Sequence, residues 1–289
     1  RARTARCPAR ACRRCARRGR ARNRVATRAG DRHLLPSGGA LVVSGFVSHY
    51  GAGPGDPELL TLKAADCAGS LPSVAAVAIS GNDGNSGRAV VASDEAIADA
   101  GFDMEKLNLN KVGVIWGSGI GGLKTFEDEM IYFGKGDGTP KINPFFIPKM
   151  IADSSSGQIS IRNGFRGPNY VTVSACSSAN NAIIDAFNYI RTGRVHVCIT
   201  GGSEAPVTIA SVGGFTAMHA MSTRNDDPAT ASRPYDVDRD GFVVGEGAGA
   251  LVLEEYEHAK ARGAKIYAEL IGGGFSSDAY HITAPHPDG

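Results

Sequence analysis

The hydrophobic positions of this chain fall into short apolar runs that alternate with stretches of three- and four-residue periodicity. The runs predict strands at residues 41–48, 111–117, 170–175, 195–202, 249–255 and 265–274. The periodic stretches predict helices at residues 89–103, 123–133, 177–193 and 255–263. Repeated strand–helix–strand units indicate an α/β fold in which helices cover the sheets. Residues 134–148 are predicted to form a Gly- and Pro-rich loop, and residues 49–88 carry little pattern.

The charge distribution separates the N-terminal segment from the rest. Residues 1–32 hold thirteen Arg and one Asp, a net charge of +12, so the remainder carries −10 because the whole chain carries +2. With few apolar residues, the Arg-rich segment 1–40 is predicted to be disordered, and 41–289 to be the folded domain. A transit peptide and an RNA-binding arm are alternatives. An artefact of wrong-frame translation is favoured, because the composition changes abruptly at Leu41.

The three cysteines after residue 40 lie far apart in the chain. Cys67, Cys176 and Cys198 form no disulfide framework, which indicates a reducing compartment. Cys198 lies inside an apolar strand and is expected to be a small buried hydrophobe. No apolar run approaches the ~18 residues of a membrane span, and no secretory signal is visible.

Cys176 lies where the strand pattern of "NYVTVSA" changes to the helix pattern of "SSANNAIIDAF". Unpaired N–H groups and the positive end of the dipole favour a thiolate at the first turn of a helix. Small neighbours leave room for a substrate, and the cysteine's own N–H can hold an oxyanion. Position alone therefore makes Cys176 equally a candidate nucleophile and a candidate buried residue.

Two glycine- and acid-rich motifs have competing interpretations. "GSGIGG" places Gly117, Gly119 and Gly122 between a strand and a helix, the setting of a dinucleotide-binding turn. The expected ribose-binding acid is missing from a second strand end, so close backbone packing is the preferred explanation. "DVDRDGFVVGEG" (236–247) resembles a calcium loop but has Gly247 where the bidentate Glu belongs. A charged turn before a buried strand is predicted there.

Histidines are the usual activators of a nucleophilic thiol. His258 lies on a charged helix and is predicted to be solvated, while His196 falls among strand residues. His281 is the one attractive partner, although a hydrogen-bonded loop histidine is the preferred interpretation of it.

Residues from about 89 to 289 closely resemble the β-ketoacyl-acyl carrier protein synthases, condensing enzymes of the thiolase fold. The resemblance rests on "GSGIGGLKTF", "NPFFIPKMIA", "GPNYVTVSACSSANNAI", "TGGSEA", "SSDAYHITAPHPDG" and the long run from "GGFTAMHAMSTRNDDP" to "KIYAEL". The synthase II type fits best. The resemblance implies a layered αβαβα fold, of which this chain holds the N-terminal half and the start of the C-terminal half.

The resemblance also implies roles for particular residues. Cys176 matches the acyl-accepting nucleophile, Ile120 matches a residue lining the acyl tunnel, and Phe215 matches the gate beside the cysteine. His219 stands where a related enzyme has an arginine that faces the carrier protein. The implied partners are acyl- and malonyl-acyl carrier protein and, in the parent family, a second copy of the subunit, with "VTVSA" near the two-fold axis. No metal, organic cofactor, nucleic acid or membrane span is implied.

The implied reaction is decarboxylating condensation in fatty acid elongation, in the bacterial cytoplasm; a plastid is the less favoured location. The family's two catalytic histidines lie in motifs that this sequence does not contain, and His281 matches neither. Acylation of Cys176 without condensation is therefore expected. A non-enzymatic fragment of a synthase is the second interpretation, and a dinucleotide-binding protein through Gly117, Gly119 and Gly122 the third. A chain-length factor is disfavoured because those proteins lack the cysteine.

Overall fold

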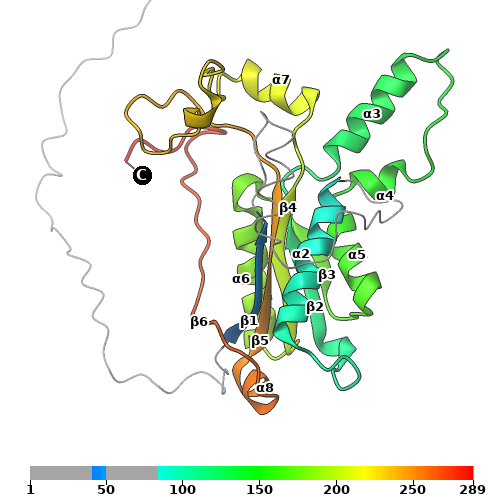
Figure 1. Cartoon of the computed structure of the whole chain (residues 1–289), viewed down its shortest axis with the longest axis vertical. Helices are drawn as coiled ribbons and strands as arrows, with labels where there is room; N and C mark the ends of the chain where they lie inside the picture. The colour runs from blue at the N-terminus through cyan, green and yellow to red at the C-terminus, as the bar shows by residue number, and fades with distance from the viewer. Residues whose placement is uncertain (1–40, 50–83, 289) are drawn as a thin grey trace, which may run out of the picture. The chain divides into compact units, whose positions relative to one another are not determined.

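A computed structural model describes residues 41–49 and 84–288, with side chains placed for Leu41 and Val42 and from 84 onward. The expectations for residues 1–40 and 50–83 lie outside this range. One six-stranded mixed sheet forms the centre, in the order β3-β2-β4-β5-β1-β6 (Figure 1). β2 is parallel to β3 and β4, whereas β4, β5, β1 and β6 are antiparallel neighbours. The strands are β1 (Leu41–His49), β2 (Val112–Gly117), β3 (Asn169–Thr172), β4 (Val197–Glu204), β5 (Gly247–Glu255) and β6 (Ala268–Leu270).

Helices cover both faces of this sheet. On one face, α2 (Gly84–Ala100) and α5 (Ser154–Asn163) enclose a core that includes Val114 and Trp116. On the other, α6 (Ser178–Arg191) packs on a core that includes Ile115. Successive residues of β2 thus enter opposite cores, as the two-residue period of a strand requires. A strand buried on both faces reads as the unbroken apolar run from which β2 was predicted.

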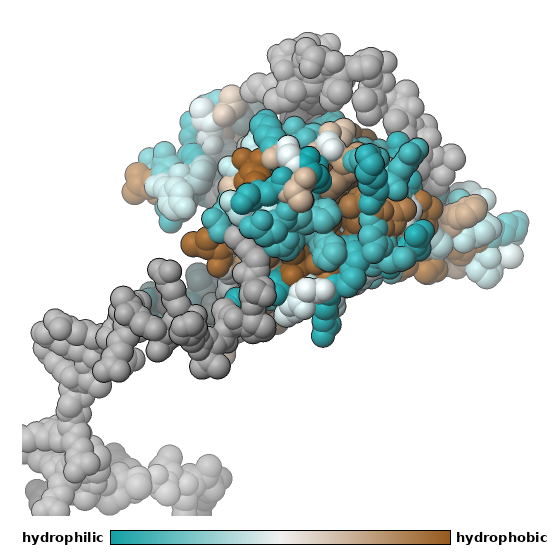
Figure 2. All heavy atoms as spheres, turned by 90° about the horizontal axis from the view of Figure 1, so that it is seen from below, coloured by the Kyte–Doolittle hydropathy of each residue, from teal (hydrophilic) through white to brown (hydrophobic). Residues whose placement is uncertain are grey.

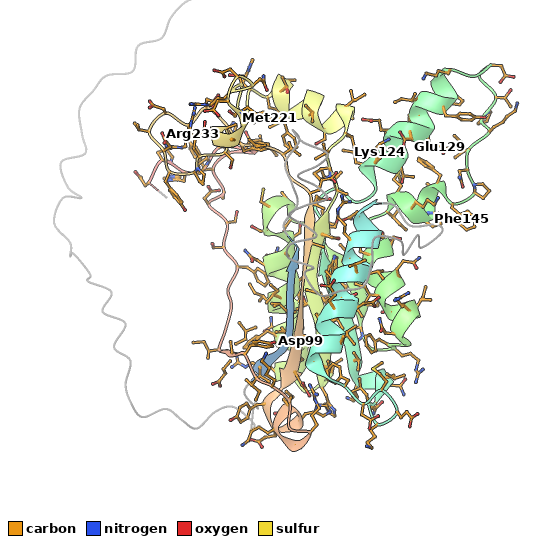
Figure 3. The ribbon with its side chains drawn as sticks, in the orientation of Figure 1. Asp99, Lys124, Glu129, Phe145, Met221 and Arg233 are labelled. Atoms are coloured by element: carbon orange, nitrogen blue, oxygen red, sulfur yellow. The ribbon has the colours of Figure 1, made fainter. Side chains whose placement is uncertain are left out.

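In the part of the chain that the structure describes, four further helices lie outside these two layers: α3 (Leu123–Gly134), α4 (Phe146–Met150), α7 (Ile209–Ala217) and α8 (Tyr256–Ala261). α3 and α4 form an arm together with the loop between them (Figure 3). Phe126 stacks on Phe146 at 6.1 Å, and the Glu129 carboxylate accepts a hydrogen bond from the Asn143 backbone N–H at 2.7 Å. Apolar side chains of this arm remain exposed, among them Tyr132 and Phe145.

The predicted α/β class is confirmed, and all predicted strands and helices are present. Two strands are shorter than predicted: β3 ends at Thr172, and β6 covers only Ala268–Leu270. The loop prediction for 134–148 is wrong at its end, where α4 begins, and neither α5 nor α7 was anticipated. Within residues 41–49 and 84–288, no helix has both the length and the apolar character to cross a membrane.

Candidate active site

Cys176 lies on a tight turn between a strand and a helix. β3 ends at Thr172, the 3-10 turn η3 spans Ala175–Ser177, and α6 follows from Ser178. Ala175 adopts a φ of 51°, in the left-handed region that an alanine occupies only under constraint from its surroundings. The turn leaves Cys176 exposed. Its predicted position at the strand-to-helix junction is confirmed; the predicted cavity at the thiol stays a prediction.

Side-chain hydrogen bonds hold this turn from the helix side. The Ser178 hydroxyl donates to the Ala175 carbonyl at 2.7 Å and accepts from the Ser174 N–H at 2.9 Å. The Asn181 amide donates to the Ser174 hydroxyl at 2.6 Å. The Thr172 hydroxyl donates to the Ser178 carbonyl at 2.7 Å. The backbone on both sides of Cys176 is therefore held by hydrogen bonds among residues 172–181.

Glycines allow the first turn of α6 to lie directly on the sheet. A Cβ atom added to Gly117, at the end of β2, would clash with the backbone nitrogen of Ala179. A Cβ on Gly202 of β4 would come within 2.8 Å of the Ala179 side chain. The preference for close backbone packing as the role of these glycines is confirmed at Gly117.

The "GSGIGG" loop binds a carboxylate of its own chain. Glu204, the last residue of β4, accepts hydrogen bonds from the Gly119 N–H at 2.6 Å and the Ile120 N–H at 3.2 Å. The Ser118 hydroxyl donates to the same carboxylate at 3.3 Å. Loop amides of this kind form anion sites, and here the anion is internal. The donors that a pyrophosphate would use are already engaged, which argues against the dinucleotide interpretation.

The family-matched residues lie on two elements. Gly119 lies beside the turn, since a Cβ there would be 3.5 Å from the Ala175 carbonyl oxygen, so the loop that carries Ile120 adjoins Cys176. Ile120 itself is 44% exposed. Phe215 lies on α7, where its ring packs edge-on against Phe242 at 5.1 Å. His219 follows this helix, exposed and with a left-handed φ of 54°.

The second cysteine occupies the opposite environment. Cys198 is fully buried at the second position of β4. Burial raises the pKa of its thiol to about 12, because a thiolate cannot be solvated there. The expectation of an inert core residue is confirmed.

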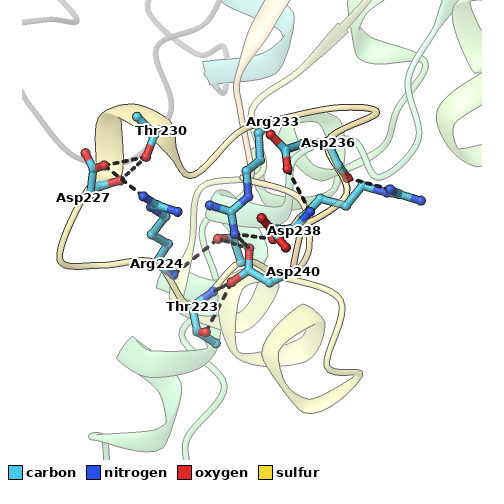
Figure 4. Close-up of polar contacts among 10 residues, drawn as sticks. Thr223, Arg224, Asp227, Thr230, Arg233, Asp236, Asp238 and Asp240 are labelled. Carbon is cyan, nitrogen blue, oxygen red and sulfur yellow. Dashed lines mark hydrogen bonds and ion pairs between the residues drawn. The ribbon is translucent and has the colours of Figure 1, made fainter.

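The calcium-like loop is a network of ion pairs and turns (Figure 4). Asp240 accepts hydrogen bonds from the Ser222 hydroxyl at 2.7 Å and the Thr223 N–H at 2.9 Å, and it pairs with Arg233 at 3.2 Å. Asp236 accepts from the Asp238 N–H at 2.8 Å. The hydrogen bonds from Ser222 and Thr223, together with the charge of Arg233, hold the pKa of Asp240 below its usual value. The acids therefore shape a charged turn ahead of β5, and among residues 84–288 no cluster of three or more His, Cys, Asp and Glu side chains suits a metal.

The histidines depart from expectation in one case. The ring Nδ1 of His281 accepts hydrogen bonds from the backbone N–H groups of Thr283 at 3.1 Å and Ala284 at 3.0 Å, as preferred for a loop histidine. The prediction that His258 is solvated is wrong. Its ring is half-buried, lies 2.6 Å from the Glu254 carboxylate and packs 5.6 Å from the His196 ring. No local pattern signals this contact, because Glu254 appears only as part of an apolar strand.

An exposed cysteine on the turn between β3 and α6 is the arrangement expected from the resemblance to the β-ketoacyl-acyl carrier protein synthases. The family model described as Beta-ketoacyl synthase, N-terminal domain, matches residues 85–259. The chain belongs to this family.

Relatives and solved structures agree with this assignment. The chain is 52% identical over 202 residues to 3-oxoacyl-[acyl-carrier-protein] synthase 2 of Synechocystis and 53% identical over 203 residues to that of Rhizobium meliloti. These alignments cover 70% of this chain but 48% of each relative, so the chain spans about half the length of the curated relatives it matches. A β-ketoacyl synthase from Burkholderia phymatum superposes with a TM-score of 0.72 at 31% identity, over 86% of this chain and 67% of that one. A type II polyketide ketosynthase in complex with its acyl-carrier protein gives 0.71 at 26% identity, over 85% and 65%.

Proposed function

We propose that Cys176 accepts an acyl group as a thioester, in a decarboxylating condensation that elongates fatty acyl chains. The observation that carries the proposal is the exposed thiol on a turn where Ala175 has a left-handed φ. A residue presented in this way projects from the end of the sheet, where a bulky thioester can reach it. α6 begins two residues after Cys176, and the positive end of its dipole favours a thiolate and an oxyanion there.

The condensation has two stages with different requirements. First, the acyl group moves from its carrier to Cys176, and the carrier leaves as a free thiol. Second, malonyl-carrier protein loses CO2, and the resulting carbanion attacks the thioester. We propose that Cys176 serves the first stage, while the second relies on the two catalytic histidine motifs of the family. Ile120 would line the acyl path and Phe215 would gate the thiol.

The proposed partners follow from the relatives. The matched synthases carry acyl carrier protein in their names, and a similar ketosynthase was solved with its acyl-carrier protein. Acyl- and malonyl-acyl carrier protein are accordingly the proposed partners, with the exposed Cys176 as the acceptor of the acyl group. The three bacterial genera among the matched synthases favour the cytoplasm of a bacterium.

A homodimer is proposed through β3. This strand is terminal in the sheet, and none of its residues from Asn169 to Thr172 is fully buried. Val173, directly after it, is 62% exposed. A terminal strand with free backbone groups on one side can pair with the same strand of a second copy. Sedimentation equilibrium of the purified chain tests this proposal: a dimer that Val173→Lys dissociates supports it, and a monomer contradicts it.

Incubation with the octanoyl thioester of N-acetylcysteamine tests the acylation stage. Peptide mass spectrometry is expected to find slow octanoylation at Cys176, because one N–H remains for the oxyanion and losing one donor costs ~10²–10³ in rate. A radiolabelled malonyl assay is expected to release no CO2. Labelling that persists in Cys176→Ala would overturn the assignment of the nucleophile. Absence of labelling would favour the non-enzymatic fragment, and elongation by this chain alone would return His281 to the list of catalytic candidates.

A further inference from the structure

We infer that Glu204 is a positioning residue for Cys176, which acts through the "GSGIGG" loop. The inference rests on the proposed acylation of Cys176 and assigns a role to a side chain that is not itself required to touch the acyl group. Glu204 ends β4, Ser118 follows the end of β2, and the turn of Cys176 follows β3. Because these three strands are parallel neighbours, their carboxyl ends bring the carboxylate, the loop and the thiol-bearing turn to one edge of the sheet.

The Glu204 carboxylate holds the "GSGIGG" loop in place through hydrogen bonds. It accepts from Gly119 N–H, Ile120 N–H and the Ser118 hydroxyl, so three donors of consecutive residues converge on one anion. Bonds to a charged acceptor are roughly twice as strong as those between neutral groups. Ser118 is buried and in turn accepts from the Asn85 amide at 3.0 Å and the Gly121 N–H at 3.2 Å. The loop is therefore pinned along its length, with Glu204 as its only charged contact among these bonds.

The loop of residues 118–121, which follows β2, also supports the Cys176 turn. The backbone at Gly119 is close enough to Ala175 that an added Cβ would lie 3.5 Å from its carbonyl oxygen and 3.7 Å from its Cα atom. A left-handed alanine is unfavourable by itself and persists only where its surroundings determine it. Ser178 and Asn181 hold the turn from the helix, and the 118–121 loop holds it from β2. Loss of Glu204 would remove the second support.

Acylation is more sensitive to this support than simple alkylation. In acylation, a bond forms between Cys176 Sγ and the acyl carbon, the carbonyl oxygen becomes an oxyanion, and the carbon–sulfur bond to the leaving thiol then breaks. The thiol proton ends on the departing sulfur. The oxyanion requires the Cys176 N–H in a fixed direction. Alkylation by iodoacetamide displaces iodide directly at carbon and needs only an accessible thiolate.

The variant Glu204→Gln separates the two reactions. Glutamine has the same shape and can keep the Gly119 and Ile120 N–H groups on its Oε1, but its NH2 group would then face the Ser118 hydroxyl, and the loop would lose its charged acceptor. The rate of Cys176 octanoylation is expected to fall about tenfold, while iodoacetamide alkylation of Cys176 stays within about twofold. Peptide mass spectrometry of the full chain resolves Cys176 from the other thiols in both reactions.

Glu246→Gln is the matched control. The Glu246 carboxylate also accepts a backbone hydrogen bond, from Val207 N–H at 3.0 Å, and it pairs with Arg88 at 2.6 Å, but it makes no contact with the 118–121 loop among the bonds described. The control is expected to keep the wild-type ratio of octanoylation to alkylation. An unchanged ratio in Glu204→Gln, or an equal change in the control, overturns the inference. Wild-type chain that is not octanoylated at Cys176 overturns the proposed function instead.

Discussion

The two ends of the central sheet are held together by different kinds of contact. At the carboxyl ends of β2, β3 and β4, glycines bring backbones into contact, and the exposed thiol of Cys176 stands on a turn with little side-chain bulk around it. At the opposite end, the fully buried carboxylate of Glu254 receives two hydrogen bonds from Arg262, both at 2.7 Å. The surface there is largely hydrophilic with apolar side chains between (Figure 2).

The contacts that stabilise the sheet therefore change from one end to the other. Arg262 also donates to the Ala100 carbonyl at 2.8 Å and lies over the Phe102 ring at 4.3 Å, so one side chain ties β5, α8 and the end of α2 together. Long side chains supply stability at that end. The other end relies on close contacts between backbones. Each of the following predictions alters one end and asks whether the other responds.

The largest expected contrast is between the two thiols. Cys176 is exposed, whereas Cys198 lies in the core at the far end of the sheet and becomes accessible only when the structure opens. With unfolding free energies of 5–15 kcal/mol, Cys176 should react with iodoacetamide at least about a thousandfold faster. Peptide mass spectrometry over time measures both rates. In urea the two rates should converge, and similar rates in the native chain would refute the contrast.

The next largest effect is expected when Arg262, the partner of Glu254 at the end of the sheet opposite Cys176, is removed. Arg262→Ala would leave the Glu254 carboxylate buried without the guanidinium, and the free energy of unfolding should fall by about 3 kcal/mol. Urea denaturation followed by circular dichroism measures the loss. Arg239→Ala, at an exposed arginine that donates only to the Asp236 carbonyl among the bonds described, should stay within about 0.5 kcal/mol. Equal losses in the two variants would mean that Glu254 does not depend on its guanidinium.

A smaller loss is expected at the site end. The added methyl group of Gly117→Ala would meet the backbone of Ala179, so α6 must move away from the sheet. Such overpacking should cost about 2 kcal/mol and slow the octanoylation of Cys176. Gly213→Ala, in α7, is the control, since nothing lies within 4 Å of the added atom. If Gly117→Ala matches this control in urea stability and in labelling, the close approach of α6 is not required.

The smallest effect concerns the pH dependence of stability at the end of the sheet that carries His196 and Glu254. Burial, followed by the nearby His258 and Lys111, lowers the pKa of His196, while Glu255 opposes the shift. A histidine whose folded pKa is lowered stabilises the fold above its unfolded pKa, about 6.5, and this contribution is lost progressively as the pH falls from that value through the folded pKa. Urea unfolding at about pH 7.5 and about pH 5.5 should therefore show a larger acid loss in the wild type than in His196→Gln. Equal losses would exclude His196 as the cause.

Sequence reasoning succeeded where burial alone dictates structure. β2 was predicted because both its faces are buried, and α6 because its apolar positions repeat at three and four. It missed α5, whose sequence "SSSGQISIRN" is mostly polar and becomes helical by packing against α2 and β3. Here tertiary contacts override weak local propensity.

The candidate site divides in the same way. Cys176 could be found because it lies where two hydrophobic periods meet, which is a local signal. The contact of Glu204 with the 118–121 loop joins residues more than eighty positions apart, and a glutamate in "TGGSEA" carries no local sign of its partner. The His258–Glu254 contact was missed because a buried carboxylate inside an apolar strand is rare.

The left-handed alanine at position 175 also bears on how variants of this protein would be selected. Glycine occupies that conformation without the ~1–2 kcal/mol penalty of a Cβ atom, so a screen for heat resistance would favour Ala175→Gly. The same change would widen the range of directions in which the neighbouring thiol points. A selection for acyl transfer would then reject what the thermal screen retained, and residue 175 is where the two selections should diverge.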